Sequence, residues 1–400
     1  MKKLSILFLY ILLVSCSSTK IAKESYNNQL FLTDGTQFAK KDFYPDFSWQ
    51  VTPQYLMFAD GQRVLNTTEV KRIAKLSDFI CIEKNHAKET LGYAELGAKH
   101  EVAAFKKVKP NIKVLYYFNS AYAWPFTSYN KNFTRAEIDK HPALKKFLIK
   151  NKENGQLEHR NNVFFFDVLN PNFRKWWVET VAKGVNDSNA DGVFIDQMHG
   201  FVWLRRTQRD EVKKAMGEMM RDLKTTLGTS KTVLGNNAEK TEDVFPHVDA
   251  IMFEHFNSSK LTKENLLEEW DDMLRIAKAG KMSIFRIGVE AEEGTEEEIK
   301  GLPWPKRSAI LEQKSKERET YFLAAYLIGA QPYSYFQYGW GWRLDTGPMI
   351  NYPELIKPLG APKGAFIRTN TDKWEFAREF EHANVWIDTD KKIAKITWLK

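Results

Sequence analysis

Cysteine is scarce in this sequence: only Cys16 and Cys81 occur among 400 residues. Because Cys16 closes an N-terminal leader, Cys81 remains alone and cannot form an internal disulfide. In the apolar run DFICIE we expect Cys81 to pack in the core. The chain also lacks Cys/His clusters and histidines at close helical spacing, so we expect no metal site and no cofactor.

Several motifs that would point to other protein classes are missing. No Gly-rich dinucleotide loop follows the first apolar run, and no G-x-S-x-G elbow is present. The net charge is +8, yet the basic residues are scattered, with no basic arm or RNA-binding signature. We therefore expect no nucleic-acid partner. The net positive charge is consistent either with binding of an anionic glycan or with ordinary solvation of the protein surface.

The N-terminus, MKKLSILFLYILLVSCSSTK, has the pattern of an export leader. Lys2 and Lys3 precede an apolar run from Leu4 to Val14, which is too short for a spanning helix. The LLVSC ending resembles a bacterial lipobox, which implies lipidation of Cys16 and a membrane anchor. No acidic residue follows Cys16 directly, so we expect an outer-membrane lipoprotein facing the periplasm or the cell surface. A plain signal peptide or an uncleaved anchor is the alternative.

Beyond the leader, short apolar runs alternate with helix-like segments. The runs span residues 54–60, 78–85, 111–120, 191–196, 232–237, 249–256, 281–290 and 332–342. Eight such runs, each followed by a helix or helix-like connection, predict a (β/α)₈ TIM barrel, with a doubly wound open sheet as the alternative. Residues 360–400 alternate like antiparallel strands. We expect a signal peptide at 1–16, a tether at 17–42, a catalytic barrel at 43–355 and a C-terminal β unit at 356–400.

Polar and aromatic side chains follow the ends of the predicted strands, where TIM barrels carry their chemistry. Trp, Tyr and Phe are abundant, at 12, 15 and 27 residues, and flat aromatic rings suit stacking on sugars. The predicted strand-end residues that could bind substrate are Asp60, Glu83, Asn119, Trp124, His199, Asn236, Asn237, His255, Arg286, Glu290, Tyr338, Trp340 and Trp342. Together they favour a carbohydrate cleft.

Asp196 and Glu254 are the predicted catalytic pair. Hydrolysis of a glycosidic bond needs one carboxylic acid to protonate the leaving oxygen and a second carboxylate to attack or to activate water. Asp196 suits the ionised nucleophile, and Glu254, which follows the apolar run AIMF, suits a proton donor whose pKa is raised by burial. The structural alternatives are a helix cap or salt bridge for Asp196 and an ion pair with Arg286 for Glu254.

The sequence also resembles a known family. The segments FSWQVTPQYLMFAD, VLYYFNS, FFDVLNPNFRKWW and DGVFIDQM, with the tail FAREFEHANVWIDT, resemble the hypothetical glycosyl hydrolase family fifteen grouping over about residues 43 to 400. The layout is distantly similar to the retaining α-glycosidases of clan D. That resemblance implies that Asp196 is the nucleophile after strand four and Glu254 the acid/base after strand six, where clan D uses Asp. Gln50 and Val51 interrupt the first-strand pattern of that clan.

These observations lead to a hypothesis of function. We expect a glycoside hydrolase that cleaves an oligo- or polysaccharide, with retention through a carboxylate nucleophile and a carboxyl acid/base. The alternative is a non-catalytic glycan-binding lipoprotein on a degenerate TIM barrel. A deacetylase lacks its His/Asp metal ligands here, and a lyase would have to use Tyr338 as its base with Arg286 beside it.

Overall fold

The computed structural model describes residues 30–151 and 153–399, and Cys16 with its leader lies outside these residues. Eight parallel strands form one sheet in the order β1-β2-β3-β6-β7-β8-β9-β10. They are β1 (Tyr55–Phe58), β2 (Phe79–Ile82), β3 (Lys113–Asn119), β6 (Gly192–Asp196), β7 (Thr232–Asn236), β8 (Ala250–Glu254), β9 (Met282–Ile287) and β10 (Ser334–Tyr338). Hydrogen bonds from Phe336 N to Pro53 O and from Ala59 N to Trp342 O join β10 to β1. The predicted TIM barrel is confirmed.

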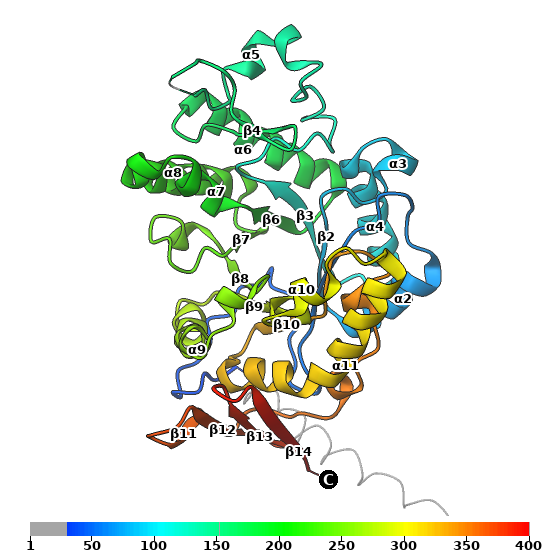
Figure 1. The fold of residues 1–400 in the computed structure, drawn as a ribbon, viewed down its shortest axis with the longest axis vertical. Coiled ribbons are helices and arrows are strands. Elements are labelled where there is room, and N and C mark those ends of the chain that lie inside the picture. The colour runs from blue at the N-terminus through cyan, green and yellow to red at the C-terminus, as the bar shows by residue number, and fades with distance from the viewer. Residues whose placement is uncertain (1–29, 152, 400) are drawn as a thin grey trace, which may run out of the picture.

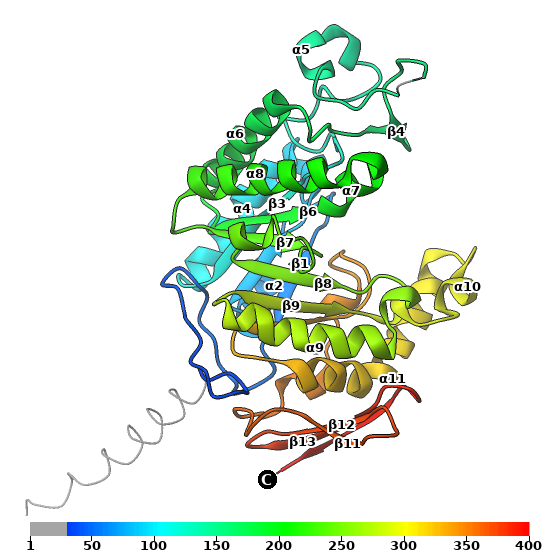
Figure 2. The ribbon, with the colours of Figure 1, turned by 90° about the vertical axis from the view of Figure 1, so that its left-hand side faces the viewer.

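The longer helices wrap the outside of this sheet, as Figures 1 and 2 show. They are α2 (Thr67–Leu76), α4 (Ala94–Val108), α6 (Pro171–Ser188), α8 (Arg209–Leu227), α9 (Lys263–Lys278) and α11 (Trp304–Gly329), with the short α3 (Lys88–Leu91), α5 (Pro142–Lys145), α7 (Met198–Leu204) and α10 (Thr295–Ile299). Between β7 and β8 the connection holds only a 3₁₀ turn, Phe245–His247. None of the helices among the described residues is long and apolar enough to cross a membrane.

Local sequence signals explain where these helices begin and end. The side chain of Asn170 caps α6 by accepting from the backbone of Asn172 and Phe173, and Pro171 occupies the first helical turn. Asn66 and Glu69 form a capping box at the start of α2. The second half of α11 is buried on all sides, which explains its uninterrupted run YFLAAYLIG.

Two additions extend the barrel. Between β3 and α6 the chain makes a long excursion with the two-stranded β4 (His159–Arg160) and β5 (Val163–Phe164), at the top of Figure 1. At the other end, β11 (Ile367–Asn370), β12 (Glu375–Glu379), β13 (Ala383–Asp388) and β14 (Ile393–Trp398) form an antiparallel sheet beside α11. The predicted C-terminal antiparallel unit is therefore present.

The expected tether at 17–42 needs a correction over its described part. Leu32 and Phe38 are buried, and the Phe38 ring stacks on Tyr333 with centroids 4.7 Å apart. Slightly further on, the Tyr44 hydroxyl donates to the carbonyl of Gly280. Residues 30–42 pack against the barrel because their few apolar side chains are buried there, although most of the surrounding residues are polar.

Candidate active site

The carboxylate of Asp196 sits at the end of β6, the fourth barrel strand, and its side chain is buried. Four donors surround it. Oδ1 accepts from the Gln197 backbone at 2.8 Å and from Asn236 Nδ2 at 2.9 Å, while Oδ2 accepts from the Tyr117 hydroxyl and, at 3.5 Å, from Asn119 Nδ2. Hydrogen bonds of this kind stabilise the ionised form of a carboxylate. Among the described residues, no cation forms a salt bridge with Asp196, so the salt-bridge alternative is not supported.

Glu254 sits at the end of β8, the sixth barrel strand, and shares one hydrogen-bond donor with Asp196. Asn236, the last residue of the intervening β7, donates through Nδ2 to Glu254 Oε2 at 2.7 Å and to Asp196 Oδ1 at 2.9 Å. These two carboxylate oxygens therefore lie no farther apart than the sum of the two distances, about 5.6 Å. The ends of three neighbouring strands thus bring the predicted pair together.

The surroundings of Glu254 favour its protonated form. Burial raises the pKa of Glu254, and the nearby Asp196 carboxylate raises it further. Arg286, the hydrogen bond from Asn236 and Lys84 act in the opposite direction, but the net shift is upward. Arg286 forms its ion pair with Glu290 rather than with Glu254. A buried carboxyl with a raised pKa beside a well-solvated or hydrogen-bonded carboxylate is the arrangement that separates a proton donor from a nucleophile.

Two residues that the sequence analysis missed belong to this site. Tyr117 binds Asp196, and strand periodicity could have revealed it, because it lies two residues before Asn119 on the same face of β3. Lys84 pairs with Glu83 at 2.7 Å and lies over the Tyr117 ring. Burial opposes the charge on Lys84, yet Glu83 outweighs it and raises the pKa of Lys84. Lys84 follows the end of β2, where strand alternation no longer predicts side-chain direction.

Other predicted residues support the pair from the same rim. Asn237 accepts from the Glu254 backbone N–H at 3.0 Å and so helps to hold the end of β8. Burial raises the pKa of Glu83, which lies near both Asp196 and Glu254. His199 is accessible to solvent, and desolvation together with the nearby Lys260 lowers its pKa. Asn237 and Gln197, each directly after a site residue, have positive φ, a strain that clusters at active sites.

A pocket of about 250 Å³ opens beside Glu254. It is lined by Glu254, Phe256, Arg286, Glu290, Ile299, Trp304, Arg307, Leu311, Trp340, Gly341 and Trp342. The guanidinium of Arg286 lies 4.6 Å from the centre of the Trp342 ring and binds Glu290. Glu290 folds back over Gly288, where an added Cβ would lie 2.2 Å from Oε2 of Glu290. The predicted residues Arg286, Glu290, Trp340 and Trp342 therefore meet at one wall.

Four predicted substrate-binding residues make their contacts elsewhere. Asp60 pairs with Arg63 at 3.1 Å, and the Trp124 ring stacks on Phe126. The Tyr338 hydroxyl donates to the Ser315 carbonyl on α11, outside the barrel. His255 points toward Glu269 on α9, and although burial opposes its charge, that carboxylate raises its pKa. Neighbouring strand residues face opposite sides, so Glu254 and His255 cannot both face the interior.

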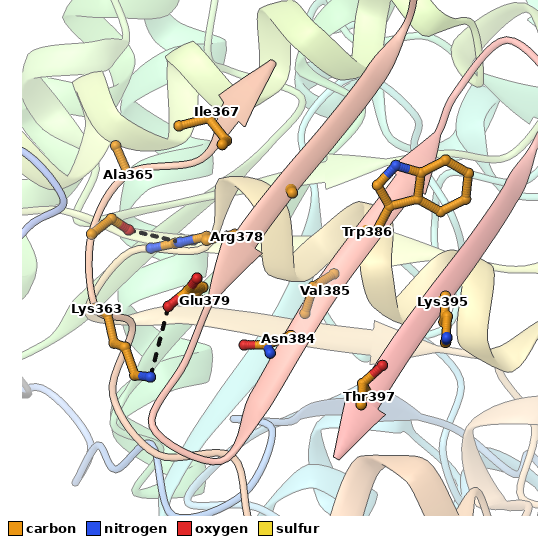
Figure 3. A pocket seen from close by; sticks show the side chains of 12 residues that line it. Lys363, Ala365, Ile367, Arg378, Glu379, Asn384, Val385, Trp386, Lys395 and Thr397 are labelled. Atoms are coloured by element: carbon orange, nitrogen blue, oxygen red, sulfur yellow. Dashed lines mark hydrogen bonds and ion pairs between the residues drawn. The ribbon is translucent and has the colours of Figure 1, made fainter. Parts of the chain in front are cut away.

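A larger hollow of about 440 Å³ lies on the outer face of the C-terminal sheet (Figure 3). Trp386 lies on that face with Asn384, Lys395 and Thr397 around it. The only carboxylate in its lining, Glu379, is 3.7 Å from Lys363. A single carboxylate cannot supply the pair that glycoside hydrolysis needs. Within the described part of the chain, no group of three or more His, Cys, Asp or Glu side chains could hold a metal ion.

Two solved structures with a TM-score of 0.50 support the fold. An alpha-amylase from Geobacillus thermoleovorans, complexed with acarbose, matches with a TM-score of 0.50 at 12% identity, over 86% of this chain and 87% of that one. Amy13B of Eubacterium rectale matches with a TM-score of 0.50 at 8% identity over the same shares. The glycoside hydrolase domain of a Pseudomonas aeruginosa PelA variant matches with a TM-score of 0.44 at 12% identity, over 76% and 96%. No curated protein matches the sequence.

The sequence also matches a family model. The model of hypothetical glycosyl hydrolase family 15 matches residues 106–384, a span that contains Asp196, Asn236 and Glu254. The match is shorter at both ends than the resemblance noted over residues 43 to 400, and it leaves out the first-strand segment FSWQVTPQYLMFAD. Because it covers well over half of the chain, the protein belongs to hypothetical glycosyl hydrolase family 15 and is a glycoside hydrolase.

Proposed function

We propose that the protein cleaves an oligo- or polysaccharide with retention of anomeric configuration, using Asp196 as nucleophile and Glu254 as acid/base. The observation that carries this proposal is the Asn236 amide, which binds both carboxylates and keeps two of their oxygens within about 5.6 Å. Retaining glycosidases place their carboxyl groups about 5–5.5 Å apart, whereas inverting enzymes need about 6.5–9.5 Å to admit a water molecule. The spacing here fits a direct attack on the sugar.

The two chemical steps follow from the positions of these groups. In the first, an oxygen of Asp196 attacks the anomeric carbon while the bond to the leaving oxygen breaks, and protonated Glu254 gives its proton to that oxygen. In the second, the Glu254 carboxylate takes a proton from water, whose oxygen attacks the anomeric carbon and releases Asp196. The raised pKa of Glu254 keeps the first step's proton available at higher pH than an ordinary carboxyl would.

The alternatives are less well supported by the site. A degenerate, non-catalytic barrel would have lost one carboxylate from the cleft, yet Asp196 and Glu254 share a donor. A lyase built on Tyr338 and Arg286 would need the phenol in the cleft, and this hydroxyl binds Ser315 on the outer helix. Within the class of carbohydrate substrates, we propose an anionic glycan on the basis of the +8 net charge.

The stereochemical course is the direct test of this mechanism. We expect proton NMR, recorded in the first minutes of hydrolysis, to show the anomer that matches the configuration of the cleaved bond. Mutarotation then produces the other anomer more slowly. Initial formation of the opposite anomer would contradict a double displacement by Asp196 and Glu254 and would indicate an inverting enzyme instead.

We also propose that the mature protein is a lipoprotein of the bacterial outer membrane, anchored through Cys16 and facing the periplasm or the cell surface. Its barrel would span residues 43–355 and its C-terminal unit residues 356–400. The leader sequence supports the anchor. Cys16→Ser should move the protein from the membrane fraction to the soluble fraction on cell fractionation, and Cys81→Ser should not. Equal membrane association of both variants would refute lipidation at Cys16.

A further inference from the structure

The pocket beside Glu254 has one strongly aromatic side. Phe256 and Trp304 line it and are 51% and 41% exposed, although large aromatic side chains usually bury most of their surface. Trp340 and Trp342 line the same pocket from the segment after β10. Exposed aromatic faces next to a catalytic carboxyl offer stacking surfaces for a sugar ring. The lining therefore suits a saccharide unit rather than water alone.

The position of the pocket relative to the two carboxylates indicates which part of the substrate it holds. Glu254 lines the pocket, whereas Asp196 does not. In the proposed mechanism Glu254 faces the leaving oxygen and Asp196 faces the anomeric carbon of the other sugar. A saccharide in this pocket is therefore the one that departs in the first step.

With Glu254 protonated, as the first step of the proposed mechanism requires, the charges of the groups that line this pocket do not cancel. Arg286 is paired with Glu290, which accounts for one positive and one negative group. Arg307, in the first turns of α11, also lines the pocket and is exposed, and among the residues that the structure describes it has no carboxylate within ion-pair distance. An unpaired guanidinium over an aromatic pocket is a site for an anion.

We propose that this pocket binds the leaving-group sugar and that Arg307 selects a sugar bearing an anionic substituent, either a carboxylate or a sulfate. The proposal rests on the function proposed above and adds the residue that recognises the anionic substituent. A guanidinium forms paired hydrogen bonds with the oxygens of either group. A positively charged amino sugar would instead be repelled by Arg307, since the neighbouring Arg286 already neutralises Glu290.

The test compares acidic glycans with neutralised forms that keep the same linkages. Polygalacturonate is paired with its carboxyl-reduced form, and chondroitin sulfate with its desulfated and its carboxyl-reduced forms. Release of reducing ends is measured for the wild type, Arg307→Gln and the control Lys306→Gln. Lys306 is an exposed cation on the same turn that does not line the pocket. Binding of the same glycans to Asp196→Asn protein, with and without Arg307→Gln, is followed by tryptophan fluorescence.

We expect removal of the substituent to lower kcat/KM of the wild type about tenfold or more, in line with the strength of charge-assisted pairs. Arg307→Gln should abolish this preference, so that its kcat/KM on the acidic form falls to about its value on the neutral form, while Lys306→Gln keeps the wild-type preference. Comparison of the carboxyl-reduced and the desulfated substrates shows whether Arg307 recognises the carboxylate or the sulfate.

Other outcomes separate this proposal from the one it rests on. Equal cleavage of acidic and neutral forms by the wild type, or a preference that survives Arg307→Gln, overturns the role of Arg307 and leaves the glycosidase mechanism intact. If no glycan in the panel is cleaved, the binding measured by tryptophan fluorescence tests the role of Arg307. Loss of the preference for acidic glycans in the Arg307→Gln protein supports the proposal, and a preference that persists overturns it. Hydrolysis that is unchanged by Asp196→Asn contradicts the proposed mechanism instead.

Discussion

Asp196→Asn should lower kcat/KM on any glycan that the wild type cleaves by a factor on the order of 10⁴ to 10⁶, the range seen when single members of a catalytic triad are removed. The amide has nearly the same size as the carboxylate, so the barrel should fold unchanged. It has no negative oxygen to attack the anomeric carbon. Its NH₂ group replaces one of the two oxygens and would therefore face either the donors on Gln197 and Asn236 or those on Tyr117 and Asn119, all of which now point at acceptors. Initial rates of reducing-end release measure the loss.

A control for this variant lies directly before the same strand. Asp191 precedes β6 at the opposite end of the barrel, where it pairs with Lys106 at 2.6 Å and accepts from Val114 N. Asp191→Asn should cost some stability but leave kcat/KM within about twofold, because it touches no substrate. Thermal unfolding of both variants checks that they are folded. An Asp196→Asn protein with wild-type turnover would show that Asp196 is not the nucleophile.

Glu254→Gln should slow hydrolysis of natural glycans by about 10²- to 10⁴-fold, the usual contribution of a positioned acid. Substrates with a good leaving group, such as dinitrophenyl glycosides, need no proton in the first step. They should therefore form the glycosyl–Asp196 intermediate quickly and accumulate it, because the base for the second step is missing. Mass spectrometry of the intact protein would detect the added sugar. Azide, which attacks without a base, should release it as a glycosyl azide.

The same substitution has a consequence for pH. The first step needs protonated Glu254, so the rate falls as the pH rises through the pKa of this carboxyl. Because burial and Asp196 raise that pKa, the alkaline limb of kcat/KM should lie above the ordinary range of glutamate, near 4.3. In Glu254→Gln the limb should be absent. Glu268→Gln, at an exposed ion pair with Lys240, serves as control and should keep it. An unchanged alkaline limb in Glu254→Gln would assign the acid to another residue.

The sequence was informative where backbone geometry alone decides position. Parallel strands that are buried on both faces appear in the sequence as short apolar runs. The carboxyl ends of such strands meet at one rim of a barrel. For this reason the run of strands is enough to place Asp196, Asn236 and Glu254 at one rim, and the fold class follows from the same runs. The packing of residues 30–42 was missed because two buried apolar side chains, Leu32 and Phe38, are easily overlooked in a polar segment.

Side-chain direction was harder to predict. Both Glu254 and His255 were plausible rim residues, but alternation allows only one of them to face the interior, and the sequence does not say which. For the same reason Tyr338 was wrongly predicted to face the cleft. Its hydroxyl lies against Ser315 outside the barrel, whereas its neighbour Gln337 contacts the Met57 carbonyl inside. Beyond the last paired residue of a strand the alternation ends, so the approach of Lys84 to Tyr117 depends on tertiary contacts alone.

In the proposed mechanism, the amide of Asn236 also determines which oxygen of Glu254 carries the proton. Both carboxylates only accept when ionised, so Nδ2 must face them, and a flipped amide would place its oxygen against two negative groups. Oε2 of Glu254 then accepts from Asn236 in both protonation states, which leaves Oε1 as the oxygen that carries the proton. In the proposed mechanism the glycosidic oxygen would therefore approach Glu254 from the Oε1 side, opposite the contact with Asn236.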